Sequence, residues 1–125
     1  MPAAGTPALS SQFVENFASG GSPVEAVAAA GSVIANATQL SASARIHTVS
    51  GADDTKGVVL PATVAGVEHR IYSEQATNGL KLYPPVNSTL NGGTANSALV
   101  MEGKTGAICF ATNATNWAVI FTLNS

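Results

Sequence analysis

Short runs of β-branched and aromatic residues recur from Ser32 onward, separated by turn residues. Their spacing of about 8 to 12 residues is typical of an all-β domain. We therefore predict a mainly β fold, a single antiparallel β-sandwich or barrel. The runs occupy residues 32–40, 44–50, 57–60, 66–73, 79–83, 98–102, 106–111 and 116–123.

Two of these runs show the alternation of a strand most clearly. In residues 116–123, NWAVIFTL, apolar residues fill both alternating faces, which predicts a strand covered on both sides. In residues 67–72, VEHRIY, His69 lies on one face and Arg70 on the other, so we expect this strand to present a polar face. Between two further runs, Asn78-Gly79 predicts a hairpin, because both residues accept positive φ.

The segment SPVEAVAAAG, residues 22–31, carries the signals of a short helix. Ser22 is placed to be the N-cap, Pro23 fits the first helical position, and Glu25 completes a Ser-x-x-Glu capping box. Gly31 then ends the helix. We expect a helix of about two turns that precedes the β domain of residues 22–125 and depends on packing for its stability.

Residues 1–21 read as an extended N-terminal arm with one apolar patch, formed by Phe13, Val14 and Phe17. One helical turn would place Phe13 and Phe17 on the same side. Two interpretations stay open: the patch docks on the core of its own chain, or it anchors the arm to a neighbouring subunit.

Composition excludes several kinds of partner. Charged residues make up 10% of the 125 residues, against about 25% in an average soluble domain, so a surface covered by partners is one explanation. The five Lys and Arg residues are scattered, which disfavours nucleic acid. No apolar window is long enough to span a membrane, and the N-terminus lacks the pattern of a secretory signal. The lone Cys109 cannot form an intrachain disulfide, which indicates synthesis in a reducing cytoplasm.

No motif of catalysis or metal binding stands out. His47 and His69 do not have the spacing of a compact ligand motif, and Asp53-Asp54 lies in a loop without the EF-hand pattern. There is no Gly-x-Ser-x-Gly elbow or phosphate-binding glycine loop, and Cys109 lies in an apolar strand. We therefore expect no enzymatic activity, no cofactor and no metal.

The stretch LKLYPPVNSTLNGG, residues 80–93, reads as a strand that ends in a rigid corner. Leu80 and Leu82 should point inward. Proline has no N–H for a neighbouring strand, so Pro84 and Pro85, which follow Tyr83, should end the pairing. We expect Tyr83, Pro84 and Pro85 to position a surface for subunit contact.

A succession of turns and apolar strands over residues 44–120 resembles a β-module of structural proteins in tailed-bacteriophage virions, found in head-decoration, head-fibre and tail-associated chains. The chain departs from that pattern in having two prolines after the tyrosine, and it has no long fibre extension. The resemblance rests on Gly57 with residues 58–61, Gly66, Asn78-Gly79, residues 80–84, residues 87–93, residues 103–110 and Trp117.

The resemblance implies a decoration (cement) protein that binds the outer surface of the assembled head and stabilises it. Its partners would be the major capsid protein and further copies of itself, as a homotrimer. It would be made in the host cytoplasm and located on the capsid surface of the virion. The alternative is a tail- or head-fibre module that binds a host receptor or glycan through the loops at residues 51–57 and 87–94.

Overall fold

The computed structural model of the chain describes residues 22–122, which form ten strands and one short 3-10 helix. In chain order these are β1 (Val24–Ala28), the 3-10 helix η1 (Ile34–Asn36), β2 (Thr38–Gln39), β3 (Ile46–Ser50), β4 (Gly57–Val59), β5 (Glu68–Ser73), β6 (Leu80–Tyr83), β7 (Thr89–Leu90), β8 (Leu99–Met101), β9 (Gly106–Ala111) and β10 (Asn116–Phe121). No helix within residues 22–122 is long and apolar enough to cross a membrane.

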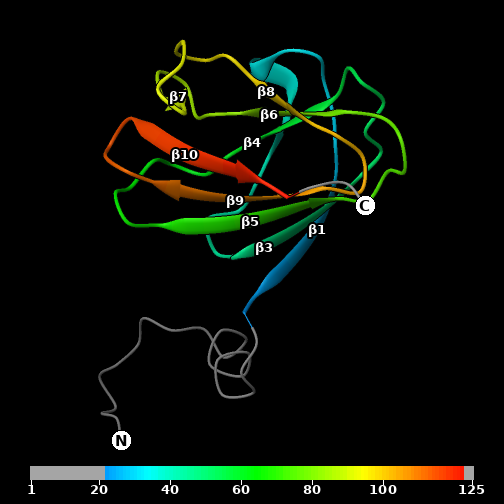
Figure 1. The fold of residues 1–125 in the computed structure, drawn as a ribbon, viewed down its shortest axis with the longest axis horizontal. Coiled ribbons are helices and arrows are strands. Elements are labelled where there is room, and N and C mark those ends of the chain that lie inside the picture. The colour runs from blue at the N-terminus through cyan, green and yellow to red at the C-terminus, as the bar shows by residue number, and fades with distance from the viewer. Residues whose placement is uncertain (1–21, 123–125) are drawn as a thin grey trace, which may run out of the picture.

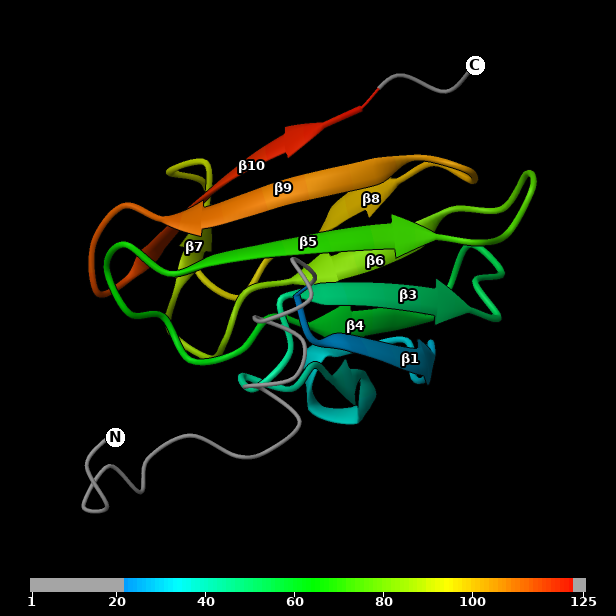
Figure 2. The same cartoon turned by 90° about the horizontal axis from the view of Figure 1, so that it is seen from below.

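Consecutive strands of the N-terminal half alternate between two sheets. Strands β1, β3 and β5 pair in parallel in one sheet, while β2, β4 and β6 pair in parallel in the other. The chain therefore winds as a β-solenoid of about four turns, with the two sheets facing each other (Figures 1 and 2). The predicted antiparallel sandwich or barrel is wrong, because the pairs among β1 to β6 are all parallel and join strands that are not consecutive in sequence.

The C-terminal strands complete the two sheets, and two of them, β8 and β9, run opposite to the strands of the N-terminal half. Strand β9 pairs antiparallel with β5 and with β10, and β8 pairs antiparallel with β6. The short β7 is added beyond β10 in parallel. The result is one sheet in the order β1-β3-β5-β9-β10-β7 and another in the order β2-β4-β6-β8.

Residues 22–31 are not helical, so that prediction is also wrong. Strand β1 takes up most of this segment and pairs with β3, with Val24 opposite Ile46. The side chain of Glu25 accepts hydrogen bonds from the Ser41 amide and from His47, so it does not close a capping box. Tertiary pairing has overridden a strong local helix signal.

The predicted hairpin at Asn78-Gly79 is wrong for the same reason as the sandwich. Strands β5 and β6 lie on either side of it but belong to different sheets, so residues 74–79 carry the chain from one sheet to the other. The Gly79 amide is bound instead by the Asp54 carboxylate at 2.6 Å. The connection is a corner of the solenoid.

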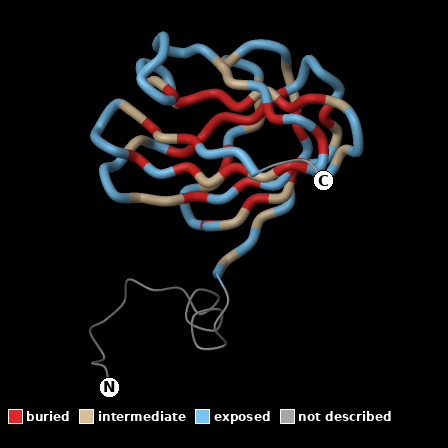
Figure 3. Tube along the Cα trace, in the orientation of Figure 1, coloured by how far each residue is buried: buried red, intermediate tan, exposed pale blue. Residues whose placement is uncertain are grey.

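The core lies between the two sheets, where the buried residues of Figure 3 gather. Strand β5 alternates as predicted, with His69 and Ile71 buried and Arg70 exposed. Strand β10 is covered on one side only: Trp117 is fully buried, but Ile120 on its outer face is 54% exposed. The prediction that this strand is covered on both sides is therefore wrong.

Strands β4 and β6 approach each other closely at Gly57. A Cβ atom at this position would lie 2.7 Å from the Lys81 carbonyl oxygen and 2.9 Å from a ring carbon of Tyr83. Such distances are too short for a side chain, so the turn of the solenoid at this point depends on glycine.

Candidate functional site

The arm residues Phe13, Val14 and Phe17 lie outside the described residues. The predicted contact residues of the proline corner lie mostly inside the molecule. Tyr83 is 7% exposed, and its hydroxyl donates to the Ser32 carbonyl at 3.2 Å. Pro84 is also fully buried, while Pro85 is partly exposed. The strand ends at Tyr83 as predicted, and a role of this corner in subunit contact stays a prediction.

Glu25, His47 and His69 form a hydrogen-bonded chain across the inner face of β1, β3 and β5. The Nδ1 of His47 lies 2.7 Å from Oε1 of Glu25, and its Nε2 lies 3.0 Å from Nδ1 of His69. Because a carboxylate only accepts, His47 donates from Nδ1 to Glu25 and accepts at Nε2 from His69. Both histidines are at most 1% exposed and lie in the core, whereas the Glu25 side chain is 22% exposed.

His69 is kept neutral by its surroundings. Burial lowers its pKa to about 4, and the neighbouring His47 and Arg45 act in the same direction. Its Nε2 has no hydrogen-bond partner among the described residues, and its ring lies 5.9 Å from that of Trp117. Because the side chain of His69 is buried, its neutral imidazole is not accessible to a substrate.

Trp117 is held in the core by a hydrogen bond of its indole. Its Nε1 donates to Oγ1 of Thr63 at 2.9 Å, and Thr63 is in turn 2.9 Å from the hydroxyl of Ser88. The only tryptophan of the sequence is therefore fully buried, and its N–H group is hydrogen-bonded inside the molecule.

Two further candidates from the sequence are also structural. Cys109 is fully buried, and burial raises the pKa of its thiol to about 12, so the reactive thiolate is suppressed. Asp53 caps its own turn through the Thr55 hydroxyl and amide, and the hydroxyl bond is the main reason for the lowered pKa of the carboxyl. Within residues 22–122, no group of three or more His, Cys, Asp or Glu side chains is arranged to hold a metal ion.

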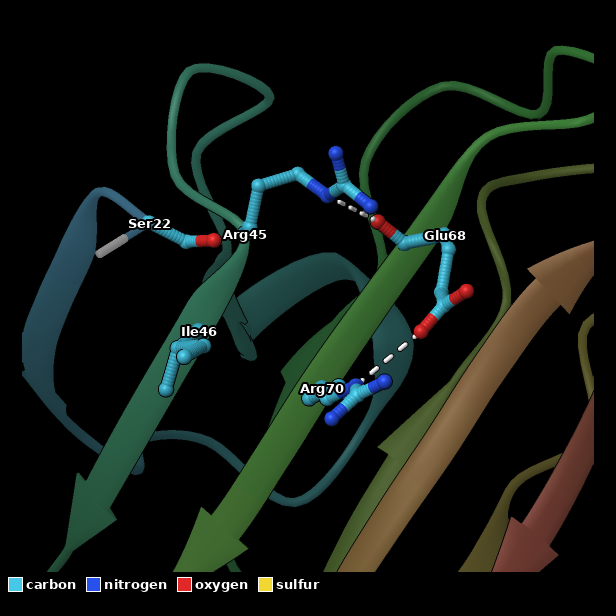
Figure 4. A pocket seen from close by; sticks show the side chains of 5 residues that line it. All are labelled: Ser22, Arg45, Ile46, Glu68 and Arg70. Carbon is cyan, nitrogen blue, oxygen red and sulfur yellow. Dashed lines mark hydrogen bonds and ion pairs between the residues drawn. The ribbon is translucent and has the colours of Figure 1, made fainter. Parts of the chain in front are cut away.

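The outer face of the six-stranded sheet carries a polar pocket of about 180 Å³, lined by Ser22, Arg45, Ile46, Glu68 and Arg70 (Figure 4). Arg45 directly precedes β3, whereas Glu68 and Arg70 belong to β5. The Nε of Arg45 donates to the Glu68 carbonyl at 2.9 Å, and the Nε of Arg70 donates to the Glu68 carboxylate at 3.0 Å. Both guanidinium groups are thus held by one residue, Arg45 at the main-chain carbonyl of Glu68 and Arg70 at its carboxylate.

An apolar groove of about 220 Å³ adjoins this pocket and shares Ile46 and Arg70 with it. Its lining also includes Tyr72 of β5, Ile108 of β9 and Thr122. Tyr72 is 40% exposed. We call the polar pocket and this groove together the outer-face site.

Sequence reasoning did not identify the outer-face site, because its residues come from strands that are distant in sequence. One signal was present: Glu25, His47 and His69 are spaced by 22 residues, and Val27, Val49 and Ile71 by the same interval. This interval is the register between β1 and β3, whereas β3 and β5 pair at an interval of 24 residues, with Ile46 opposite Arg70. Read as an approximate repeat, the pattern would have placed the segments that carry Arg45 and Arg70 on adjacent turns.

The fold and the outer-face site define the class of the molecule: a small β-solenoid with buried polar groups in its core and with a polar pocket and an apolar groove on its outer sheet face. No protein-family model, curated protein or solved structure matches the chain.

Proposed function

We propose that this chain is a non-enzymatic structural protein of a tailed-bacteriophage virion, a decoration protein that binds the outer surface of the head and stabilises it. The observation that carries the proposal is the exposed apolar outer face of β5, β9 and β10 in a chain with 10% charged residues. On this face Tyr72, Phe110 and Ile120 are 40%, 37% and 54% exposed.

Exposed apolar side chains gathered on a sheet face are typical of a surface that binds another protein. Interface centres are also depleted in charged residues, which agrees with the composition of the whole chain. The partners are the major capsid protein and further copies of the chain, in a homotrimer that contacts several capsid subunits at once.

The interior of the molecule supports a structural function. The groups that could carry chemistry, His47, His69 and Cys109, are all at most 1% exposed. The alternative, a fibre module that binds a receptor or glycan, lacks support from Trp117, because a fully buried indole offers no platform for stacking on a sugar.

The test is sedimentation of the labelled chain with purified phage heads that lack it. We expect stoichiometric binding, and we expect that deleting residues 1–20 or replacing Phe13, Val14 and Phe17 with alanine weakens it. Replacing Val33, which is 50% exposed on the described surface, is the matched control. The opposite result is a chain that stays in the supernatant when mixed with heads but is retained on a glycan array. This result would refute the decoration function and favour the fibre-module alternative.

A further inference from the structure

Four side chains form a row across the outer face of the six-stranded sheet. The strand registers place Ile46 of β3 beside Arg70 of β5, Arg70 beside Ile108 of β9, and Ile108 beside Ile120 of β10. Neighbouring strands in a sheet lie about 4.8 Å apart, so Arg70 has an isoleucine close by on each side. The row therefore presents a cation between two apolar surfaces.

The two arginines of the outer-face site keep hydrogen-bonding capacity. In the hydrogen bonds among the described residues, Arg45 and Arg70 each donate from Nε alone, so the Nη groups of both remain available. The side chain of Arg70 is 61% exposed, so an incoming group has access to it. Guanidinium N–H groups bind a carboxylate in a planar, bidentate manner.

The net charge of the outer-face site indicates the charge of the ligand that fits it. Two guanidinium groups and the Glu68 carboxylate sum to one positive charge, in a chain whose formal net charge is −2. One carboxylate neutralises this site, whereas a polyanion would meet Glu68 and an acidic protein. The isoleucines on either side of Arg70 require apolar groups on either side of that carboxylate.

The sequence of the chain contains a segment with this pattern, Phe13-Val14-Glu15-Asn16-Phe17. In an extended segment, residues two apart project to the same side at intervals of about 6.6 to 6.8 Å. Phe13, Glu15 and Phe17 would then form an aromatic-acid-aromatic face. Glu15 is also the single ionisable side chain of residues 1–21.

We propose that the outer-face site binds residues 13–17 of a second copy of the chain. The Glu15 carboxylate pairs with Arg70 and Arg45, and the rings of Phe13 and Phe17 cover the isoleucines on either side of Arg70. This inference rests on the self-association contained in the proposed function, and it names the surface that receives the arm.

The test is the self-association of the full chain, measured by sedimentation velocity over a range of concentrations at neutral pH. We expect Glu15→Gln and Arg70→Gln each to weaken association by about tenfold, the size of effect of losing one charge-assisted pair. The double variant should weaken association by clearly less than the product of the two single effects, because both changes remove the same pair between Glu15 and Arg70. Glu102→Gln, at an exposed carboxyl outside the site, is the control.

The apolar part of the site has its own matched pair of variants. Ile108→Thr should weaken association, whereas Val100→Thr should not; both are β-branched residues of strands, but Ile108 lies beside Arg70 in the site and Val100, 61% exposed, belongs to the other sheet. Both substitutions keep a residue suited to a strand, and thermal unfolding would verify that the fold is retained.

A monomeric wild-type chain at every concentration would overturn the inference, as would effects of Glu15→Gln and Arg70→Gln that simply add. Head binding is measured separately from self-association. A chain that associates through Glu15 and Arg70 but does not bind heads would refute the decoration function and leave this inference standing. A chain that binds heads as a monomer would do the reverse.

Discussion

The buried imidazole of His69 makes the stability of the fold depend on pH. In the unfolded chain this group has an ordinary pKa of 6.5, whereas in the folded chain burial lowers it to about 4. Between these two values the unfolded state binds the extra proton, so protonation favours unfolding. The contribution of neutral His69 to the free energy of unfolding is therefore fully present above about pH 6.5, and it is lost progressively as the pH falls toward 4.

The size of the effect follows from the shift. A difference of about 2.5 pH units corresponds to roughly 3 kcal/mol over the whole window, at about 1.4 kcal/mol per unit. About 2 kcal/mol of this should already be lost between pH 7 and pH 5, where most Asp and Glu side chains are still ionised. Such a loss is a large part of the stability of a small domain.

Urea unfolding followed by fluorescence measures this directly, because Trp117 is the single tryptophan and is fully buried in the folded chain. We expect the free energy of unfolding to fall by about 2 kcal/mol from pH 7 to pH 5 in the wild type. His69→Gln removes the titrating group, so its stability should be lower at pH 7 but nearly constant over the same interval. Glu102→Gln should behave as the wild type. A wild-type stability that does not change from pH 7 to pH 5, or a His69→Gln variant that loses as much as the wild type, would refute this reasoning.

Three further predictions concern the core. Leu82→Ala, at a fully buried position of β6, should destabilise the fold by about 2 to 5 kcal/mol in urea unfolding, whereas Val100→Ala at an exposed strand position should cost much less; equal effects would contradict the assignment of the core. Trp117→Phe removes the hydrogen bond to Thr63 as well as ring volume and should cost about 2 to 4 kcal/mol by chemical denaturation, and a variant as stable as the wild type would argue against that bond. Cys109 should not react with a thiol reagent at pH 8 until urea unfolds the chain, since its thiol is buried and its pKa is raised to about 12; rapid labelling of the native chain would show that β9 is accessible.

The positions of most strands could be predicted from local sequence. The alternation of His69, Arg70 and Ile71 is a local property of β5, and the end of β6 at Tyr83 follows from the proline after it. These features depend on each segment alone, so they do not depend on which strands become neighbours.

The pairing of the strands could not be predicted in the same way. Turn residues at short intervals fit hairpins, and they fit equally well the corners of a solenoid, where each turn carries the chain to the opposite sheet. In this fold the partner of β1 begins 22 positions further on, with Val24 opposite Ile46. Tertiary packing determines which strands pair. It is also the reason that the segment around Glu25 forms a strand despite its local helix signal.

The same register connects the buried polar chain to the outer-face site. His69 and Arg70 are consecutive in β5 and face opposite sides of the sheet, His69 toward His47 and Arg70 toward solvent. A slip of β5 by one residue would bury the guanidinium of Arg70 and expose Ile71. The bond between His47 and His69 favours one register over that slip, because a slipped β5 would leave the buried Nε2 of His47 without its partner. The buried chain thus helps to hold Arg70 in line with Ile46 and Ile108, so a pH low enough to protonate His69 should weaken the outer-face site together with the fold.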